Sequence, residues 1–129
     1  MRGTQADLKA RQNAGPVYLY ELDWQTPVDG GKWHSPHSLD LALVFDNVAK
    51  SASMVGSGPE PRRVAERMSS AWLAFARTGD PSTKELPWPA WRPDLGATMV
   101  FDTESRVVNG FRDEERVLLA SMQTKGPFD

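Results

Sequence analysis

The clearest pattern in the chain is a helical stripe of apolar residues in the segment Arg62–Thr78. Its members recur near i, i+4, i+8 and i+11, which predicts an amphipathic helix with one face turned inward. They are Val64, Met68, Trp72 and Phe75. Gly79 stands where a left-handed C-cap is expected, and Pro81 prevents the helix from continuing. The segment is therefore predicted to be a helix that packs on a core.

A second segment, Val17–Asp23, has the composition of a β-strand. It is rich in Val, Tyr and Leu, and Gly15 and Pro16 bound it at its start. Both sets of alternate residues are mostly apolar, which is typical of a strand covered on both faces of a sheet. We therefore expect it to be a central, parallel strand.

The remaining pattern predicts helices, a hairpin and loops. Ser38 could cap a short helix within His37–Asn47, and Thr98–Asp102 with Arg106–Asn109 suggests an edge hairpin. A final amphipathic helix, Arg112–Met122, would turn Val117, Leu118 and Met122 inward, and Thr4–Asn13 is weakly helical. The predicted loops are Gln25–Pro36, Ala49–Pro61 and Asp80–Gly96.

Composition excludes several classes of protein. The 129 residues carry a net charge of −2, and the basic residues are scattered, which gives no basis for nucleic-acid binding. No apolar run is long enough to cross a membrane, and the first residues do not resemble a signal peptide. The absence of cysteine excludes disulfides and fits a reducing compartment.

The sequence has two histidines, His34 and His37, in one loop after the predicted strand. Functional groups of open α/β sheets gather beyond the carboxyl ends of the strands, so a general base on this loop would be well placed. A metal site from His34, His37 and Asp40 is disfavoured, because Pro36 prevents a regular helix and no second ligand cluster exists. We therefore expect neither a metal nor a cofactor.

Five motifs in order resemble the C-terminal region of type-B carboxylesterases and cholinesterases. In that family a V-Y-x-Y strand precedes H-[GS]-x-[DE]-L-x-x-V-F, then W-x-x-F-A-x-x-G-x-P, a P-W-P-x-[YW] loop and an M-x-F/L-D strand. The matching segments begin at Val17, His37, Trp72, Pro87 and Met99. The resemblance runs from about Gly15 to about Leu119, nearly the whole chain.

The resemblance implies that residues 1–129 are the C-terminal segment of an α/β-hydrolase catalytic domain. It places the family's catalytic histidine on His37 and gives His34 no role. His37 would take a proton from a serine hydroxyl during attack on an ester carbonyl and return it to the leaving alcohol. Imidazoles titrate near neutral pH, which suits both steps. In the family the serine and the acid precede the histidine, so both would lie upstream of Met1.

The other parts of such a site are missing from the sequence. Gly56-Ser57-Gly58 lacks the spacing of a G-x-S-x-G nucleophile turn, and no glycine-rich oxyanion loop exists. We expect Asp40 to cap its helix or face solvent, and neither Glu21 nor Asp23 is a convincing triad acid. The chain alone should therefore be inactive, because triad members act as a unit.

Two alternatives remain open. The chain could be a stand-alone, non-catalytic α+β binding module, or a decayed esterase remnant. The segment Trp88–Pro93 could dock on a proline-recognition domain, but a rigid aromatic loop packing on the sheet is favoured. If the chain is a fragment, it would expose a sheet edge and apolar helix faces, and would self-associate or bind the missing N-terminal part.

Overall fold

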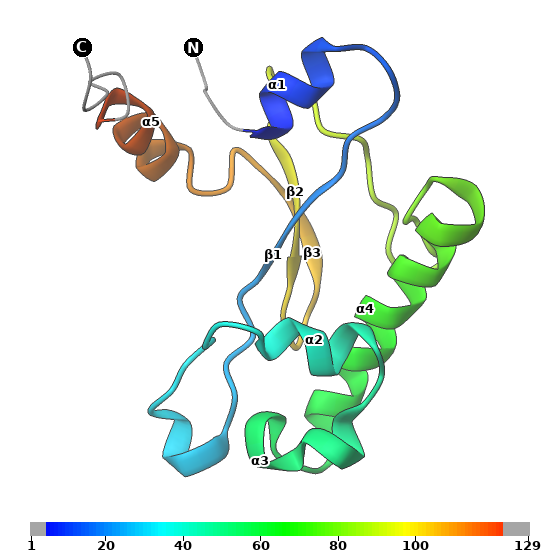
Figure 1. Ribbon diagram of the computed structural model, residues 1–129, viewed down its shortest axis with the longest axis vertical. Coiled ribbons are helices and arrows are strands. Elements are labelled where there is room, and N and C mark those ends of the chain that lie inside the picture. The colour runs from blue at the N-terminus through cyan, green and yellow to red at the C-terminus, as the bar shows by residue number, and fades with distance from the viewer. Residues whose placement is uncertain (1–4, 123–129) are drawn as a thin grey trace. The chain divides into compact units, whose positions relative to one another are not determined.

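The computed structural model describes residues 5–122, which form a small sheet and several helices (Figure 1). The strands are β1 (Leu19–Leu22), β2 (Ala97–Phe101) and β3 (Arg106–Asn109). The α-helices are α1 (Gln5–Arg11), α2 (Leu39–Val44), α3 (Ala52–Val55), α4 (Pro59–Thr78) and α5 (Asp113–Met122). Two 3₁₀ turns, η1 (Val28–Gly31) and η2 (Val48–Ser51), interrupt the loops.

The sheet has three strands in the order β1-β2-β3. The backbone N–H groups of Asp23 and Trp24 both donate to the carbonyl of Phe101, at 2.9 and 3.1 Å. The carboxyl ends of β1 and β2 therefore lie side by side, as in a parallel pair. Strands β2 and β3 form the predicted hairpin, joined by the short turn of residues 102–105.

The strand buried along its whole length is β2, whereas β1 is only half-buried. The sequence pattern predicted a doubly covered strand at Val17–Asp23, so its burial differs from the expectation. Strand β2 lies between two neighbours, whereas β1 has only β2 beside it among the described residues. An apolar strand at the edge of this sheet is the exposed edge that the fragment interpretation expects.

The chain divides into two compact units. Within the described residues, the first unit comprises residues 5–19, 89–98 and 108–122. Here the Trp91 indole N–H donates to the buried carboxylate of Asp7 at 2.9 Å, and the Arg116 guanidinium lies 5.1 Å from the centre of the Trp91 ring. Trp91 is therefore a core residue of this unit.

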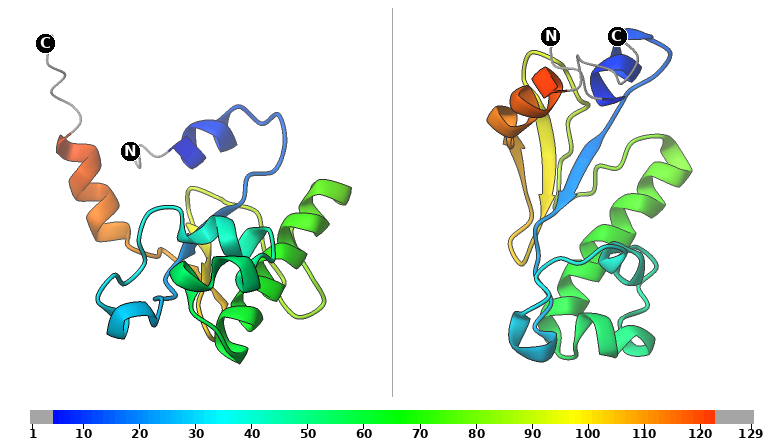
Figure 2. Two further views of the ribbon diagram at one scale, coloured as in Figure 1. Left: turned by 60° about the horizontal axis from the view of Figure 1, so that its bottom comes forward. Right: turned by 60° about the vertical axis from the view of Figure 1, so that its left-hand side comes forward.

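The second unit, Tyr20–Trp88 with Met99–Val107, contains the longest helix. Helix α4 packs against α2 and the η2 turn, and Figure 2 shows these segments beside its N-terminal half. The side chains that α4 buries are Pro61, Val64, Ala65, Met68 and Ala71. The helix ends as predicted, with Gly79 in the left-handed conformation and its N–H donating to the carbonyl of Phe75 at 2.7 Å.

The predicted stripe of α4 is buried only in its first half. Val64 and Met68 are fully buried, but Trp72 is 43% exposed and Phe75 46% exposed. Helix α5 likewise exposes Val117, Leu118 and Met122, which were expected to point inward. The apolar pattern was recognised correctly, but these side chains remain partly or largely exposed in the folded segment. Exposed apolar helix faces of this kind are consistent with a fragment.

Two local predictions were incomplete or wrong. The segment Ala49–Pro61 was expected to be a loop, but it contains η2, α3 and the first turn of α4. Ser38 makes no capping hydrogen bond to α2 and adopts a positive φ of 71°. A serine in the left-handed region cannot direct its hydroxyl to the first helical N–H groups in the way an N-cap in the β-region does. No helix among residues 5–122 is long and apolar enough to span a membrane.

We expect Met68→Ala to lower the free energy of unfolding by about 2–5 kcal/mol, because it leaves a cavity at a fully buried position. The control is Ser70→Ala on the same helix, which is exposed and should change stability by about 0.5 kcal/mol or less. Urea unfolding followed by circular dichroism measures both. Equal effects of the two substitutions would contradict the complete burial of Met68.

Candidate active site

The two histidines lie on the loop of residues 23–38, which leaves the carboxyl end of β1 and leads into α2. Its first two N–H groups bind Phe101 at the carboxyl end of β2. The position therefore matches the edge of a sheet at which α/β proteins place functional groups. His37 directly precedes Ser38 and the first turn of α2.

The loop is closed at its base by hydrogen bonds to its own backbone. The N–H of Thr26 donates to the carbonyl of His34 at 2.9 Å, and the Ser35 hydroxyl donates to the carbonyl of Trp24 at 2.7 Å. The Thr26 hydroxyl in turn donates to the carbonyl of Met54 at 2.6 Å. These bonds hold residues 34–35 against residues 24–26, so the segment entering His37 has a defined position.

Trp24 attaches the start of this loop to α4. Its ring is 1% exposed, and its indole N–H donates to the Glu60 carboxylate at 2.8 Å. Glu60 lies in the first turn of α4, where a negative charge is also favoured by the helix dipole. A buried indole needs a partner for its single donor, and Glu60 supplies it.

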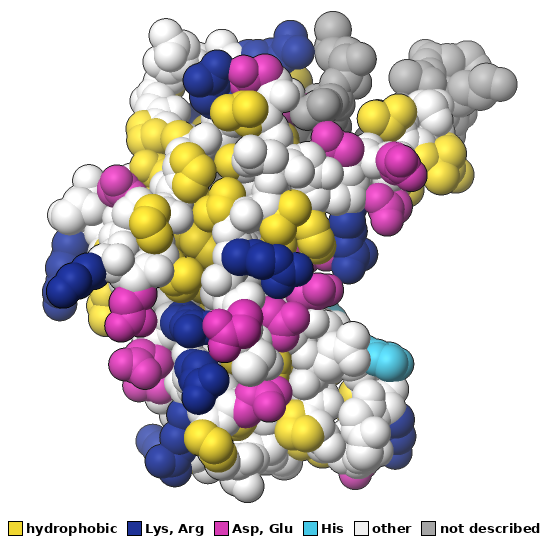
Figure 3. All heavy atoms as spheres, turned by 180° about the vertical axis from the view of Figure 1, so that it is seen from behind, with side chains coloured by type: hydrophobic (Ala, Val, Ile, Leu, Met, Phe, Trp, Pro, Cys, Tyr) yellow, Lys and Arg dark blue, Asp and Glu magenta, His cyan; other side chains and the backbone are white. Residues whose placement is uncertain are grey.

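His34 and His37 are both exposed, and Figure 3 shows a histidine side chain, in cyan, at the surface. The Nδ1 atom of His34 lies 3.1 Å from the amide oxygen of Gln25, so its ring has a partner within the loop. The exposure of His37 is compatible with a base that must reach a group outside this chain. The two histidines are therefore both exposed, and the ring of His34 has a hydrogen-bonding partner in the loop.

Asp40 neither caps α2 nor points freely into solvent, contrary to the expectation from the sequence. It is half-buried, and its carboxylate accepts a hydrogen bond from the Tyr20 hydroxyl at 3.2 Å. Tyr20 lies on β1 and Asp40 in the first turn of α2, so the contact links the strand to the helix that follows His37. Sequence reasoning missed this pair because its members are far apart in the chain.

The Tyr20 ring is fixed by edge-to-face contacts with three aromatic side chains. Its centroid lies 6.2 Å from Trp72, 6.4 Å from Trp88 and 5.9 Å from Phe101. Burial raises the pKa of the Tyr20 phenol above its ordinary value, and the Asp40 charge and hydrogen bond raise that pKa further. The hydroxyl therefore keeps its proton, and keeps donating it to Asp40, across the physiological pH range.

The backbone around His37 is strained. His34 and Ser38 both have positive φ, of 53° and 71°, in the region that side chains with a Cβ rarely adopt. The motif noted above has Gly or Ser at the position of Ser38, and the left-handed conformation accounts for glycine there. Strain of this kind persists only where surrounding contacts hold it, and it concentrates at functional sites.

The other candidates from the sequence are not assembled into a site. Glu21 and Asp23 are half-buried on and just after β1. Gly56 ends α3 and Gly58 precedes α4, so the Gly56–Gly58 segment is a connection between helices, as predicted, and not a strand-to-helix nucleophile turn. No group of three His, Cys, Asp or Glu side chains among residues 5–122 could hold a metal ion.

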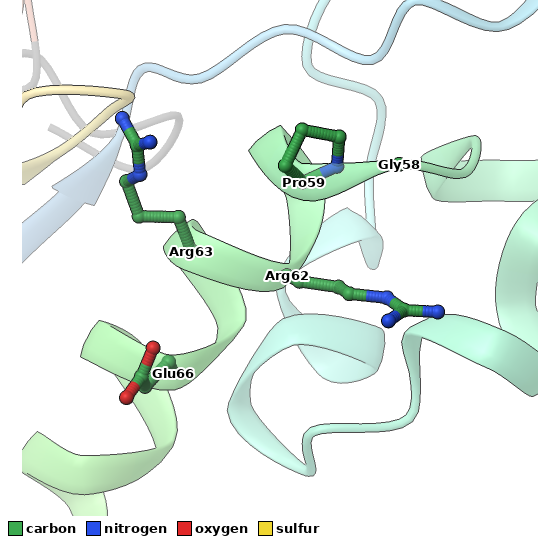
Figure 4. A pocket seen from close by; sticks show the side chains of 5 residues that line it. All are labelled: Gly58, Pro59, Arg62, Arg63 and Glu66. Carbon is green, nitrogen blue, oxygen red and sulfur yellow. The ribbon is translucent and has the colours of Figure 1, made fainter.

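A shallow depression at the start of α4 is a second candidate site (Figure 4). It is lined by Gly58, Pro59, Arg62, Arg63 and Glu66. The guanidinium groups of Arg62 and Arg63 point away from each other in Figure 4, and Arg63 lies 3.9 Å from the Glu104 carboxylate. Diverging and partly neutralised arginines do not form an anion clamp.

The Trp/Pro-rich segment packs as the simpler interpretation predicted. Trp88 is 6% exposed and Trp91 3% exposed. The Trp88 ring centre lies 5.7 Å from that of Phe101 on β2. Both tryptophans of this segment are thus core residues, and neither is presented as a ligand for a proline-recognition domain.

Comparison with known proteins agrees with the motifs. The sequence profile of the carboxylesterase family matches residues 3–118. The chain is 31% identical over 117 residues to the para-nitrobenzyl esterase of Bacillus subtilis, covering 89% of this chain and 24% of that protein. It is 32% identical to the phenmedipham hydrolase of Pseudarthrobacter oxydans, covering 76% of this chain and 21% of that protein. The chain thus spans about a quarter of the length of these relatives.

Solved structures give the same result. A crystal structure of a Geobacillus stearothermophilus carboxylesterase matches with a TM-score of 0.69 and 38% identity, over 86% of this chain and 24% of that one. A para-nitrobenzyl esterase structure matches with a TM-score of 0.73 and 30% identity, over 83% of this chain and 22% of that one. The fold described here is therefore that of a segment of an α/β-hydrolase.

The raised pKa of Tyr20 predicts how the stability of the folded chain depends on pH. The unfolded chain would lose the phenolic proton at a lower pH than the folded chain, whose Tyr20 pKa lies above the ordinary value of 10.0. The contribution of Tyr20 to stability is therefore fully present below pH 10.0 and is lost as the pH rises through the folded pKa. Ultraviolet titration of tyrosinate in a Tyr18→Phe background measures this, since the sequence has two tyrosines. A Tyr20 that titrates at its ordinary value would contradict the Asp40 contact.

Proposed function

Because the chain belongs to the carboxylesterase family, we propose that it is part of a serine carboxylic-ester hydrolase and supplies its general acid and base, His37. The observation that carries the proposal is the position of His37. It is an exposed residue directly before Ser38 and α2, in the loop after the carboxyl end of a sheet strand, and it matches the histidine of the family motif.

In this proposal the imidazole of His37 accepts the proton of a serine hydroxyl as the oxygen attacks the ester carbonyl. It then donates that proton to the leaving alcohol, which leaves an acyl-serine. In the second half of the cycle His37 accepts a proton from water, the resulting hydroxide attacks the acyl group, and the proton returns to the serine. The chemistry needs no metal or cofactor.

The serine, the acid and the oxyanion donors are proposed to lie in polypeptide upstream of this segment. The sequence has no G-x-S-x-G motif and no glycine-rich oxyanion loop, and the segment spans about a quarter of its relatives. A histidine without these partners lacks both a nucleophile and stabilisation of the oxyanion. The chain alone is therefore proposed to be inactive.

Partly exposed apolar side chains also support a contact with polypeptide outside this segment. Trp72, Leu73 and Phe75 of α4 are 43–54% exposed, and Leu118 and Leu119 of α5 are about 60% exposed. Surfaces of this kind mark contacts with other polypeptide. We infer that the missing part of the same catalytic domain covers them in the complete enzyme, and that in its absence copies of the chain associate.

A stand-alone binding module is less well supported. Such a module would need to bury its own large aromatic side chains. Trp24, Trp88 and Trp91 are buried, but Trp33 is 55% exposed and Trp72 is 43% exposed. The segment therefore supplies only part of the interior that its tryptophans require.

The roles of the two histidines can be tested in an active enzyme. The chain is joined to the upstream part of the Bacillus subtilis para-nitrobenzyl esterase, and hydrolysis of a p-nitrophenyl ester is followed. We expect His37→Gln to lower kcat/KM at least about a thousandfold, because a triad without its base loses nearly all of its rate enhancement.

The matched control for this prediction is His34→Gln, which removes the other histidine of the same loop. It should leave kcat/KM within about twofold of the unsubstituted enzyme, since His34 is exposed and outside the motif. A larger loss with His34→Gln than with His37→Gln would refute the assignment of the base.

The isolated chain is predicted to be inactive and to associate with itself. It should hydrolyse p-nitrophenyl esters no faster than its His37→Gln variant, and light scattering should give a mass above 14.3 kDa. Leu73→Glu and Leu118→Glu should shift the mass toward that of the monomer, because each places a charge on an exposed apolar face. A compact monomer that unfolds cooperatively would count against the fragment proposal.

A further inference from the structure

We propose that Tyr20 and Asp40 are a positioning pair that fixes the place of His37, an inference that rests on the proposed function. Neither residue touches the reacting atoms in this proposal. Their role is to hold the first turn of α2, and with it the histidine that precedes this turn, at the carboxyl end of the sheet. They act on the chemistry only through the position of the imidazole.

The Tyr20–Asp40 hydrogen bond links β1 to the first turn of α2. The Tyr20 hydroxyl donates to Asp40 at 3.2 Å, and Asp40 lies three residues after His37, in the first turn of the helix. The next anchor is Leu39, which is 1% exposed and whose N–H donates to the carbonyl of Pro36 at 3.2 Å. The segment from Pro36 to Asp40 is thus tied to itself and to β1.

The Tyr20 side chain, on the strand side of this hydrogen bond, is held in place by aromatic contacts. The Tyr20 ring contacts the edges or faces of Trp72, Trp88 and Phe101, with centroid distances of 5.9–6.4 Å. These three contacts hold the ring in the orientation in which its hydroxyl donates to Asp40. The hydrogen bond therefore transmits the position of the strand to the helix.

The entry side of His37 has its own anchors. The carbonyl of His34 accepts from Thr26 at 2.9 Å, and the Ser35 hydroxyl donates to Trp24 at 2.7 Å. His37 is therefore bracketed, with backbone anchors before it and the Tyr20–Asp40 bond after it. The strained φ of 71° at Ser38, between His37 and α2, requires such anchors to persist. The exposed His37 thus lies between hydrogen-bonded residues on both sides of it in the chain.

An ionised acceptor strengthens this bond, because hydrogen bonds to a carboxylate are stronger than those between neutral groups. Asparagine at position 40 would keep an acceptor oxygen of similar geometry, whereas alanine would not. The two substitutions therefore separate the hydrogen bond from the remainder of the side chain. Tyr20→Phe removes the donor and keeps the clamped ring.

The test uses the full chain with carbon-13-labelled histidine, whose ring signals are followed by NMR. The sequence has two histidines, so His34 serves as an internal reference, and His34→Gln assigns the signals. We expect Tyr20→Phe and Asp40→Ala each to shift and broaden the His37 signal and to leave that of His34 in place. Asp40→Asn should leave the His37 signal close to that of the wild type. The Tyr20→Phe/Asp40→Ala double variant should shift the His37 signal no further than either single substitution does.

Tyr18→Phe, which removes the other phenol of the same segment, is the matched control and should leave the His37 signal unchanged. Circular dichroism melts show whether a variant has lost its fold. A role in general stability would move both histidine signals together, and that outcome would overturn the proposal. So would a His37 signal that does not respond to Tyr20→Phe in a chain that remains folded.

The NMR experiment tests the positioning pair, and the kinetic experiment tests the catalytic role of His37, so each claim can be refuted without the other. A His37 signal that responds to Tyr20→Phe, together with full activity of His37→Gln in the joined enzyme, would retain the positioning pair and refute the catalytic role. Loss of activity in His37→Gln without a response to Tyr20→Phe would have the opposite meaning. Each outcome therefore identifies which of the two claims is wrong.

Discussion

The structure around His37 depends on closing a long loop at the carboxyl edge of the sheet. Residues 23–38 leave β1 and return to the start of α2, and a flexible segment of this length must be ordered at an entropic cost. The Phe101 carbonyl fixes the first residues of the loop, and Thr26 and Ser35 hold its returning part. Because the loop closes through its own backbone, the strained residues His34 and Ser38 can be maintained beside an exposed imidazole.

Helix α4 illustrates how a single element belongs to two environments. Its first half meets α2 and the η2 turn and buries Val64 and Met68 completely. Its second half continues the same apolar stripe with Trp72 and Phe75, which are nearly half exposed. Hydrophobic periodicity reports that a face is suited to burial, but it does not report whether the burying surface belongs to the same segment. The second half of the stripe is therefore the feature that most directly suggests further polypeptide.

Several elements could be predicted from the sequence because their signals are local. Gly79 and Pro81 set the end of α4, and the hairpin of β2 and β3 followed from two short apolar runs around a polar turn. The assignment of His37 as the base rests on its motif and on its place after a strand, and it stays a prediction. Ser38 was misread as a cap, because the residue type permits both a cap and a left-handed turn, and only the φ of 71° distinguishes them.

The parts that escaped prediction depend on contacts between distant residues. Nothing near Asp40 in the chain indicates that Tyr20 donates to it, and nothing near Trp24 indicates that Glu60 accepts from it. The pattern of β1 suggested burial on both faces, but the described residues place a strand on only one of its sides. Local propensity therefore located the elements, while the pairs that hold them in register could be seen only in the folded chain.

The position of His37 depends both on its local sequence and on contacts between distant residues. An exposed side chain gains little from packing, so its position must be imposed by neighbours that are themselves fixed. In this segment those neighbours are a clamped phenol, a half-buried carboxylate and a loop closed on its own backbone, all within one compact unit. The ordering of the imidazole can therefore be complete before any nucleophile is present. In the proposed enzyme, the remaining polypeptide would then not need to order this group when it binds.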